Sequence, residues 1–108
     1  MSEQWRAVAK VGAVKPGDVI PVTVDGLELA LGLDGERYFA VQRRCVHRGG
    51  DLTEGIVSRG HIICPNHAWR FSTATGRHAD ASEYCLATYS VRVVGDTIEI
   101  DPQLKEST

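Results

Sequence analysis

Apolar and polar residues alternate along most of this chain, in short runs that turn residues separate. In the first half the runs are residues 19–24, 27–33 and 38–42, with Asp25-Gly26 and Asp34-Gly35 between them. Asp-Gly turns between alternating runs are a strong local signal for β-hairpins. The first half is therefore predicted to be a meander of antiparallel strands.

The second half repeats this pattern with shorter runs. They are residues 56–57, 61–63, 70–72, 86–94 and 97–101, separated by Ser58-Arg59-Gly60, Thr75-Gly76 and Gly95-Asp96. No stretch has the period of a long helix, and residues 102–108 are predicted to be a polar tail. Short strands at this spacing predict an all-β fold, either an antiparallel sandwich or a barrel.

Two segments interrupt the strands, and each carries one cysteine and one histidine. The first loop, residues 44–55, contains CVHRGGDLTEG. The second loop, residues 64–69, is the first part of the run CPNHAWRF, which continues to residue 71. The candidate ligands are Cys45 and His47 in a Cys-x-His pattern, then Cys64 and His67 in a Cys-x-x-His pattern after sixteen intervening residues. Two thiolates and two imidazoles make a complete set of four metal ligands.

Two kinds of metal centre use such a set. One zinc ion binds two Cys and two His in a tetrahedron, whereas a [2Fe–2S] cluster takes two Cys on one iron and two His on the other. Zinc modules usually pair like ligands about two to four residues apart, but here each loop supplies one Cys and one His. The spacing favours the cluster, and a zinc-stabilised interaction module remains an alternative.

With these two loops the sequence resembles the Rieske family, whose cluster loops have the same patterns at this separation. Further positions that fit the family pattern are Gly55, Pro65, Phe71 and Gly76. The resemblance implies that Cys45 and Cys64 hold the inner iron of one [2Fe–2S] cluster, while His47 and His67 hold the outer iron and face solvent. It also implies a Rieske-type antiparallel β-sandwich, one domain over residues 1–108, with an inserted cluster-binding subdomain at about 44–76.

The cluster surroundings differ from those of respiratory Rieske proteins. Those proteins carry one extra cysteine in each loop and Ser and Tyr hydroxyls that hydrogen-bond the cluster sulfurs, whereas the corresponding positions here are Gly50, Asn66, Trp69 and Phe71. Without these hydroxyls the reduced cluster is less stabilised, so we predict a potential at the low end of the Rieske range. The chain thus resembles the ferredoxin components of bacterial aromatic-ring-hydroxylating dioxygenase systems.

This resemblance implies an electron carrier of aromatic hydrocarbon catabolism and not an enzyme. At 108 residues the chain is expected to have no room for a second, catalytic domain. The implied partners are a ferredoxin reductase and a terminal oxygenase, which would dock transiently near His47 and His67. The alternative is a small Rieske-like subunit of another reductase, of the nitrite reductase type.

Charge and composition restrict the cellular setting. The net charge of -2 gives no sign of a nucleic-acid binder, and no stretch approaches the roughly 20 apolar residues of a membrane span. The N-terminus has no apolar core of a signal peptide. Three cysteines cannot form a closed set of disulfides, so a cytoplasmic protein is expected.

Positive charge gathers around the two loops. Residues 43–77 contain six arginines and two acidic residues, a net charge of +4, which leaves -6 for the rest of the chain. The arginines are Arg43, Arg44, Arg48, Arg59, Arg70 and Arg77. They form either a solvated face or a docking surface for an acidic partner.

Three further residues with metal-binding or redox chemistry lie outside the motif. His61 and His78 are predicted to be surface or partly buried residues and not ligands. Cys85 is predicted to be a small buried hydrophobic residue just before the strand over residues 86–94.

Overall fold

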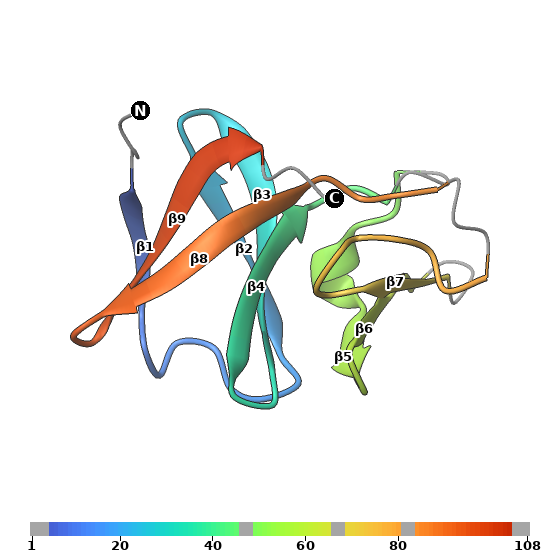
Figure 1. Ribbon diagram of the computed structural model, residues 1–108, viewed down its shortest axis with the longest axis horizontal. Helices are drawn as coiled ribbons and strands as arrows, with labels where there is room; N and C mark the ends of the chain where they lie inside the picture. Colours follow the sequence, from blue (N-terminus) through green and yellow to red (C-terminus); the bar gives the residue numbers. More distant parts are fainter. Residues whose placement is uncertain (1–4, 46–48, 66–68, 81–83, 105–108) are drawn as a thin grey trace.

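The computed structural model describes residues 5–45, 49–65, 69–80 and 84–104. These residues form strands and one short 3₁₀ turn, in two antiparallel sheets (Figure 1). The strands are β1 (Arg6–Lys10), β2 (Val19–Val24), β3 (Leu27–Asp34), β4 (Arg37–Gln42), β5 (Ile56–Ser58), β6 (His61–Ile63), β7 (Arg70–Ser72), β8 (Thr88–Val94) and β9 (Thr97–Leu104), and the 3₁₀ turn is η1 (Leu52–Glu54).

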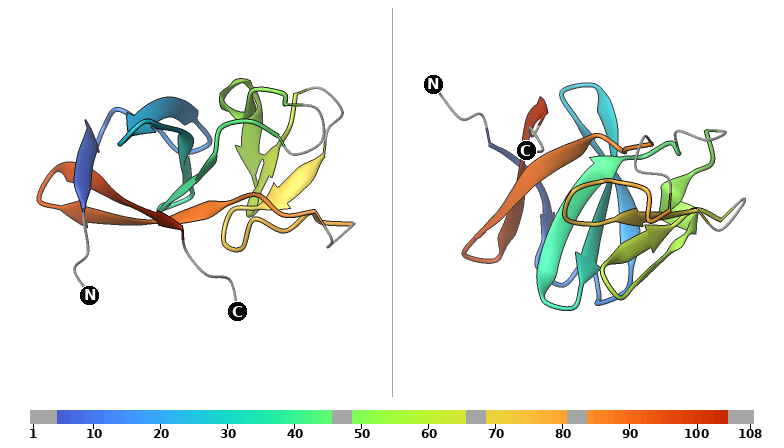
Figure 2. Two further views of the ribbon diagram at one scale, coloured as in Figure 1. Left: turned by 90° about the horizontal axis from the view of Figure 1, so that it is seen from above. Right: turned by 45° about the vertical axis from the view of Figure 1, so that its right-hand side comes forward.

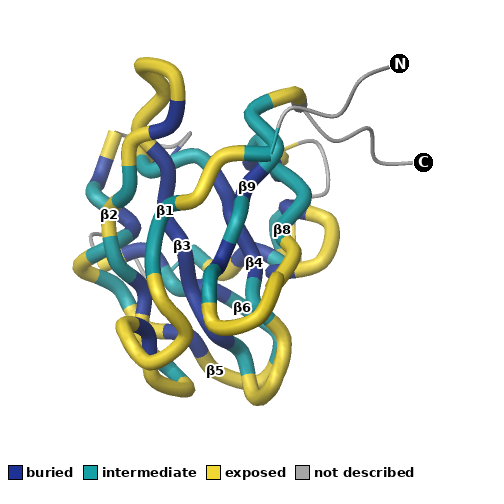
Figure 3. Tube along the Cα trace, turned by 90° about the vertical axis from the view of Figure 1, so that its left-hand side faces the viewer, coloured by how far each residue is buried: buried dark blue, intermediate teal, exposed yellow. Residues whose placement is uncertain are grey.

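The larger sheet has the strand order β1-β9-β8-β4-β3-β2. It curls so far that its two edge strands, β1 and β2, come into contact, as Figure 3 shows. The smaller sheet, β5-β6-β7, is inserted between β4 and β8 in the sequence, and it lies at one side of the larger sheet (Figure 2). Both loops belong to this inserted part.

The hairpin turns follow from the residues that occupy them. Val24 pairs with Leu27 across Asp25-Gly26, and both turn residues have positive φ, 49° and 84°. This is the geometry of a two-residue turn whose twist suits a hairpin, and Gly and Asp tolerate it better than most residues. The predicted Asp-Gly turn is therefore confirmed.

The β3–β4 hairpin is buried on both faces and separates two hydrophobic cores. Along β3, Leu29, Leu31 and Leu33 point into the core of the larger sheet, while Ala30 points the other way, as expected for alternating side chains. The core of the larger sheet, called here the base core, consists of Val14, Val24, Leu29, Leu31, Leu33, Ala40, Ile98 and Ile100.

The other core lies between the two sheets and contains two cysteines, so we call it the cysteine core. It is formed by Val19, Ala30, Phe39, Val41, Cys45, Leu52, Val57, Ile62, Cys64, Phe71 and Leu86. These residues come from β2, β3 and β4 on one side and from the inserted part on the other. Packing in this core therefore fixes both loops against the larger sheet.

The all-β prediction is confirmed, with differences at the strand boundaries. The residues of β1 show no clear alternation in the sequence, because most of them are exposed where they pair with β9, so no run was identified there. The strand predicted over residues 86–94 begins at Thr88, and β9 continues to Leu104, so residues 102–104 are not part of a frayed tail. Isolated antiparallel bridges join His78 to Phe71 and Arg77 to Cys85. The pairing next to the smaller sheet therefore continues beyond residue 76, the end expected for the inserted part.

Candidate metal centre

The two cysteines of the motif lie in the cysteine core. Cys45 is 3% exposed and Cys64 is 2% exposed, and neither forms a disulfide. Cys45 comes from the first loop, three residues after the end of β4, and Cys64 comes from the second loop, directly after β6. The other two predicted ligands, His47 and His67, lie outside the described residues.

The first loop is closed by main-chain hydrogen bonds at its neck. The amide of Leu52 donates to the carbonyl of Arg43 at 2.8 Å, and the amide of Cys45 donates to the carbonyl of Gly50 at 2.8 Å. One further bond, from the Gly49 amide to the Cys45 carbonyl, is 2.9 Å long. These bonds hold the backbone of Cys45 in one position relative to the start of η1.

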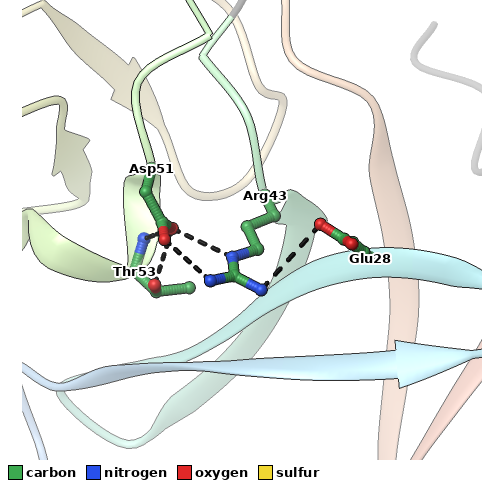
Figure 4. Close-up of polar contacts among 4 residues, drawn as sticks. All are labelled: Glu28, Arg43, Asp51 and Thr53. Carbon is green, nitrogen blue, oxygen red and sulfur yellow. Dashed lines mark hydrogen bonds and ion pairs between the residues drawn. The ribbon is translucent and has the colours of Figure 1, made fainter.

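An ion pair spans the same neck. Arg43 donates to both carboxylate oxygens of Asp51, from Nη2 at 2.8 Å and from Nε at 3.1 Å, as Figure 4 shows. Asp51 also caps η1, where it accepts hydrogen bonds from the amide and the hydroxyl of Thr53. The hydrogen bonds from Arg43, followed by those from Thr53, hold the pKa of the Asp51 carboxyl well below its usual range.

The second loop connects two neighbouring strands of the smaller sheet. Ile63 at the end of β6 pairs with Arg70 at the start of β7. Inside that pair, the Cys64 amide donates to the Trp69 carbonyl at 2.8 Å. The loop therefore starts and ends at one rung of the sheet, and Cys64 is the first residue beyond it.

Aromatic rings cover the end of the second loop. The Trp69 ring lies 4.5 Å from the His78 ring and 5.0 Å from the Tyr84 ring, and His78 lies 5.3 Å from Phe71 (centroid distances). Edge-to-face pairs at such distances are favourable. We call these four residues the aromatic cluster, and it joins the second loop to the segment that follows β7.

The two loops meet at Gly55. A Cβ atom on Gly55 would lie 2.0 Å from the carbonyl oxygen of Ile63, the residue before Cys64. The end of the first loop therefore approaches the start of the second so closely that only glycine fits. Beside this contact is a shallow cavity of about 300 Å³, lined by Glu54, Gly55, Ile56, Ile63, Cys64 and Pro65.

The described part of the site suits half of the predicted ligand set. Thiolates are the usual ligands of iron–sulfur clusters, and the cysteine core around Cys45 and Cys64 is apolar, which limits the access of water. Among the described residues, no three His, Cys, Asp or Glu side chains gather as a metal site. The other two ligands of the predicted set, His47 and His67, lie outside these residues.

The prediction for Cys85 was wrong, because its side chain is exposed. Cys85 pairs with Arg77, and its neighbour Leu86 is the residue that enters the cysteine core at 1% exposure. Successive residues of an extended chain point to opposite sides, so burial of Leu86 leaves Cys85 on the outer side. The prediction that His61 and His78 are surface or partly buried residues is confirmed, since both are partly buried. That they are not ligands stays a prediction.

The arginines around the loops divide into two groups. The exposed ones are Arg44, Arg59, Arg70 and Arg77. In this group, Nη2 of Arg70 lies 4.0 Å from Oδ2 of Asp80. Arg43 is only partly exposed and is engaged by Asp51, so it belongs to the loop and not to a docking face. Arg48 lies outside the described residues.

Sequence reasoning missed the role of Asp51 as the N-cap of η1, although Asp is a usual residue at that position and accepts a bond from the amide two residues later, here that of Thr53.

No helix among the described residues is long and apolar enough to cross a membrane.

Comparison with known proteins agrees with an iron–sulfur centre at the two loops. The chain is 36% identical over 103 residues to the ferredoxin component of the naphthalene 1,2-dioxygenase system of Pseudomonas aeruginosa. This alignment covers 94% of this chain and 98% of the relative.

Solved structures give the same result. The ferredoxin of carbazole 1,9a-dioxygenase from Nocardioides aromaticivorans IC177 superposes with a TM-score of 0.85 at 30% identity, covering 93% of this chain and 99% of that one. A structure described as a complex of reduced oxygenase and oxidized ferredoxin in carbazole 1,9a-dioxygenase contains a chain with a TM-score of 0.86 at 25% identity, covering 98% and 100%.

Residues 4–90 match the family described as the Rieske [2Fe-2S] domain. This match spans both loops and favours the iron–sulfur cluster over zinc as the metal centre. The chain therefore belongs to the Rieske [2Fe–2S] domain family.

Proposed function

We propose that this protein is the ferredoxin component of an aromatic-ring dioxygenase system. In that role it carries single electrons from a ferredoxin reductase to a terminal oxygenase and performs no chemistry on the organic substrate. When bound, one Rieske-type [2Fe–2S] cluster would accept and release the electron. The rest of the chain positions that group, limits water around it and offers it to partners.

The four residues that we propose as ligands are Cys45, His47, Cys64 and His67. Burial of Cys45 and Cys64 in the cysteine core supports a position for the thiolates on the inner side. His47 and His67 follow these cysteines by two and three residues, and the resemblance to the Rieske family assigns their imidazoles to the outer iron. Neutral imidazoles leave the centre less negative than four thiolates would, which favours uptake of an electron.

The observation that carries the proposal is the agreement in length as well as in sequence. The naphthalene dioxygenase relative is a ferredoxin component, and the alignment covers nearly all of both chains. The carbazole dioxygenase ferredoxin likewise superposes along nearly its whole length. Both relatives are named as ferredoxins of dioxygenase systems, which supports a carrier over a fixed subunit of a nitrite reductase type.

Partners are expected to dock at the end of the molecule that carries the two loops. The exposed arginines Arg44, Arg59, Arg70 and Arg77 come from this inserted part or its borders. Complementary charge mainly speeds encounter, so an acidic patch on the reductase and oxygenase would suit brief complexes. The cytoplasm is the compartment that we propose, since buried thiol ligands stay reduced there.

Reconstitution tests this proposal. The purified protein is mixed with a ring-dioxygenase reductase, NADH and the terminal oxygenase, and reduction of the oxygenase is followed with and without this chain. We expect turnover to depend on the chain and to fall as ionic strength rises. A brown, reducible protein that copurifies in a fixed ratio with another reductase, and does not support the oxygenase, would contradict the carrier role.

A further inference from the structure

The ion pair at the neck of the first loop is the least exposed of those that the described residues form. The side chains of Arg43 and Asp51 are 27% and 14% exposed. Every other ion pair among these residues has at least one side chain that is 45% exposed or more. Exposed pairs contribute little, whereas bidentate and partly buried pairs hold a defined geometry.

Arg43 also connects three separate parts of the fold. It follows the end of β4, its side chain reaches Asp51 at the start of η1, and its Nη1 lies 3.9 Å from a carboxylate oxygen of Glu28 in β3. Figure 4 shows the guanidinium between the two acidic residues. This one side chain therefore adds a polar tie between the first loop and the larger sheet to the packing of the cysteine core.

The ion pair lies one step from the proposed ligand. Arg43 and Asp51 are on the two arms of the neck, and the next rung inward is the bond from the Cys45 amide to the Gly50 carbonyl. If the arms separate, the backbone of Cys45 loses its fixed position relative to Leu52, which is fully buried in the cysteine core. Geometry at the thiolate depends on its supporting shell of contacts, as in other metal sites.

We propose that Arg43 and Asp51 are positioning residues for the metal centre: their ion pair closes the neck of the first loop and keeps Cys45 in place for ligation. This inference rests on the proposed [2Fe–2S] ligand set. It assigns Arg43 to retention of the cluster, in contrast to the exposed arginines, which remain available to partners. A guanidinium suits this task because its fork binds both carboxylate oxygens, which a lysine ammonium does not.

Cluster retention tests the proposal directly. The purified holoprotein is incubated with an excess of a ferrous-iron chelator, well below its unfolding temperature, and the loss of visible absorbance is timed. We expect Asp51→Asn and Arg43→Gln each to lose the cluster about tenfold faster than the wild type, which equals ~1.4 kcal/mol. The double variant should lose it no faster than either single variant, because both remove the same interaction.

Two further variants make the result specific. Arg43→Lys keeps the charge but not the fork, so an intermediate rate is expected, and it remains informative if Arg43→Gln does not fold. Glu99→Gln breaks the 2.7 Å ion pair with Arg92 on β8, away from both loops, and should leave the rate unchanged.

Two readouts separate positioning from general stability. Faster loss at a temperature equally far below each variant's own Tm, with an altered shape of the EPR signal of the reduced protein, supports the proposal. Unchanged loss, or faster loss that only follows a lower Tm, overturns it. If the wild type holds no cluster at all, the proposed ligand set fails instead, so the two failures are distinguishable.

Discussion

The two loops that carry the proposed ligands are held by different physical forces. At the first loop, main-chain bonds and the Arg43–Asp51 ion pair close the neck, and Leu52 anchors the exit in the cysteine core. At the second loop the strands β6 and β7 close the neck, and the aromatic cluster around Trp69 covers one end. The first loop thus depends on charge and the second on ring packing.

This difference follows from where each loop starts and ends. The second loop joins two paired strands, so the sheet itself sets the distance between its ends. The first loop joins β4 of the larger sheet to η1 of the inserted part, two elements that share no ladder. The base of the first loop has only an isolated β-bridge, between Arg44 and Asp51, and the bidentate ion pair strengthens this closure.

The largest expected effect comes from the residue where the loops meet. Gly55→Ala places a Cβ against the Ile63 carbonyl, so the end of the first loop and the start of the second must move apart. We expect insoluble protein, or soluble protein with less than about a tenth of the iron and sulfide of the wild type, since both ligand-bearing backbones are displaced. Iron and sulfide analysis measures this loss.

Gly95→Ala is the matched control for Gly55→Ala. Gly95 has a positive φ of 63°, but a Cβ there meets nothing within 4 Å. Only the cost of a left-handed conformation is expected, about 1–2 kcal/mol, with full cluster content. Equal cluster content in the two variants would show that the loops do not need their close approach.

Loss of ring packing should weaken the second loop alone. Trp69→Leu keeps an apolar side chain but removes the contacts with His78 and Tyr84, at a cost of about 2 kcal/mol. We expect a lower Tm and faster loss of the cluster to a chelator, insensitive to ionic strength. The control is Trp5→Leu, whose ring contacts Arg92 on β8 outside the inserted part. If Trp5→Leu loses the cluster equally fast, the effect of Trp69→Leu is not specific to the second loop.

Low pH should weaken the Arg43–Asp51 ion pair at the neck of the first loop. Because the folded-state pKa of Asp51 lies below its ordinary value of 3.8, the ion pair stabilises the fold above that value and this contribution is lost as pH falls below it. The Tm gap between the wild type and Asp51→Asn is expected to be about 4 °C from pH 5 to 7. It should shrink from pH 4 to 3, as followed by circular dichroism. A gap that stays constant over this range would argue against an ionised Asp51 at the neck.

The smallest effect is expected at the third cysteine. Cys85 is exposed, whereas Cys45 and Cys64 are buried, so a thiol reagent should label one cysteine in the intact holoprotein. Cys85→Ser should abolish this labelling and leave the absorption and EPR spectra unchanged. Spectral loss in Cys85→Ser would mean that the ligand set includes a residue outside the two loops.

Much of the fold could be predicted because local patterns determine it. Alternating runs and Asp-Gly or Arg-Gly turns located most strands, and the pairings Val24 with Leu27 and Ser58 with His61 agree with those turns. The thiols Cys45 and Cys64 were chosen from spacing, and their common burial agrees with that choice. Alternation does not specify which face of a short, irregular segment is buried, which explains the error at Cys85.

The contacts between distant segments were beyond prediction from sequence. Nothing near Arg43 in the sequence distinguishes it from the exposed arginines, because its role depends on how β4 and η1 meet in space. The aromatic cluster likewise joins Trp69 to Tyr84 through a segment that follows β7. Such contacts depend on tertiary packing, which propensity and spacing do not encode.

The most direct test of the central claim is the low-temperature EPR spectrum of the dithionite-reduced protein, read together with its absorption before reduction. The ligand set Cys45, His47, Cys64 and His67 predicts a brown protein with a rhombic signal whose average g value lies clearly below that of all-cysteine clusters. A colourless, EPR-silent protein with one equivalent of zinc would contradict it.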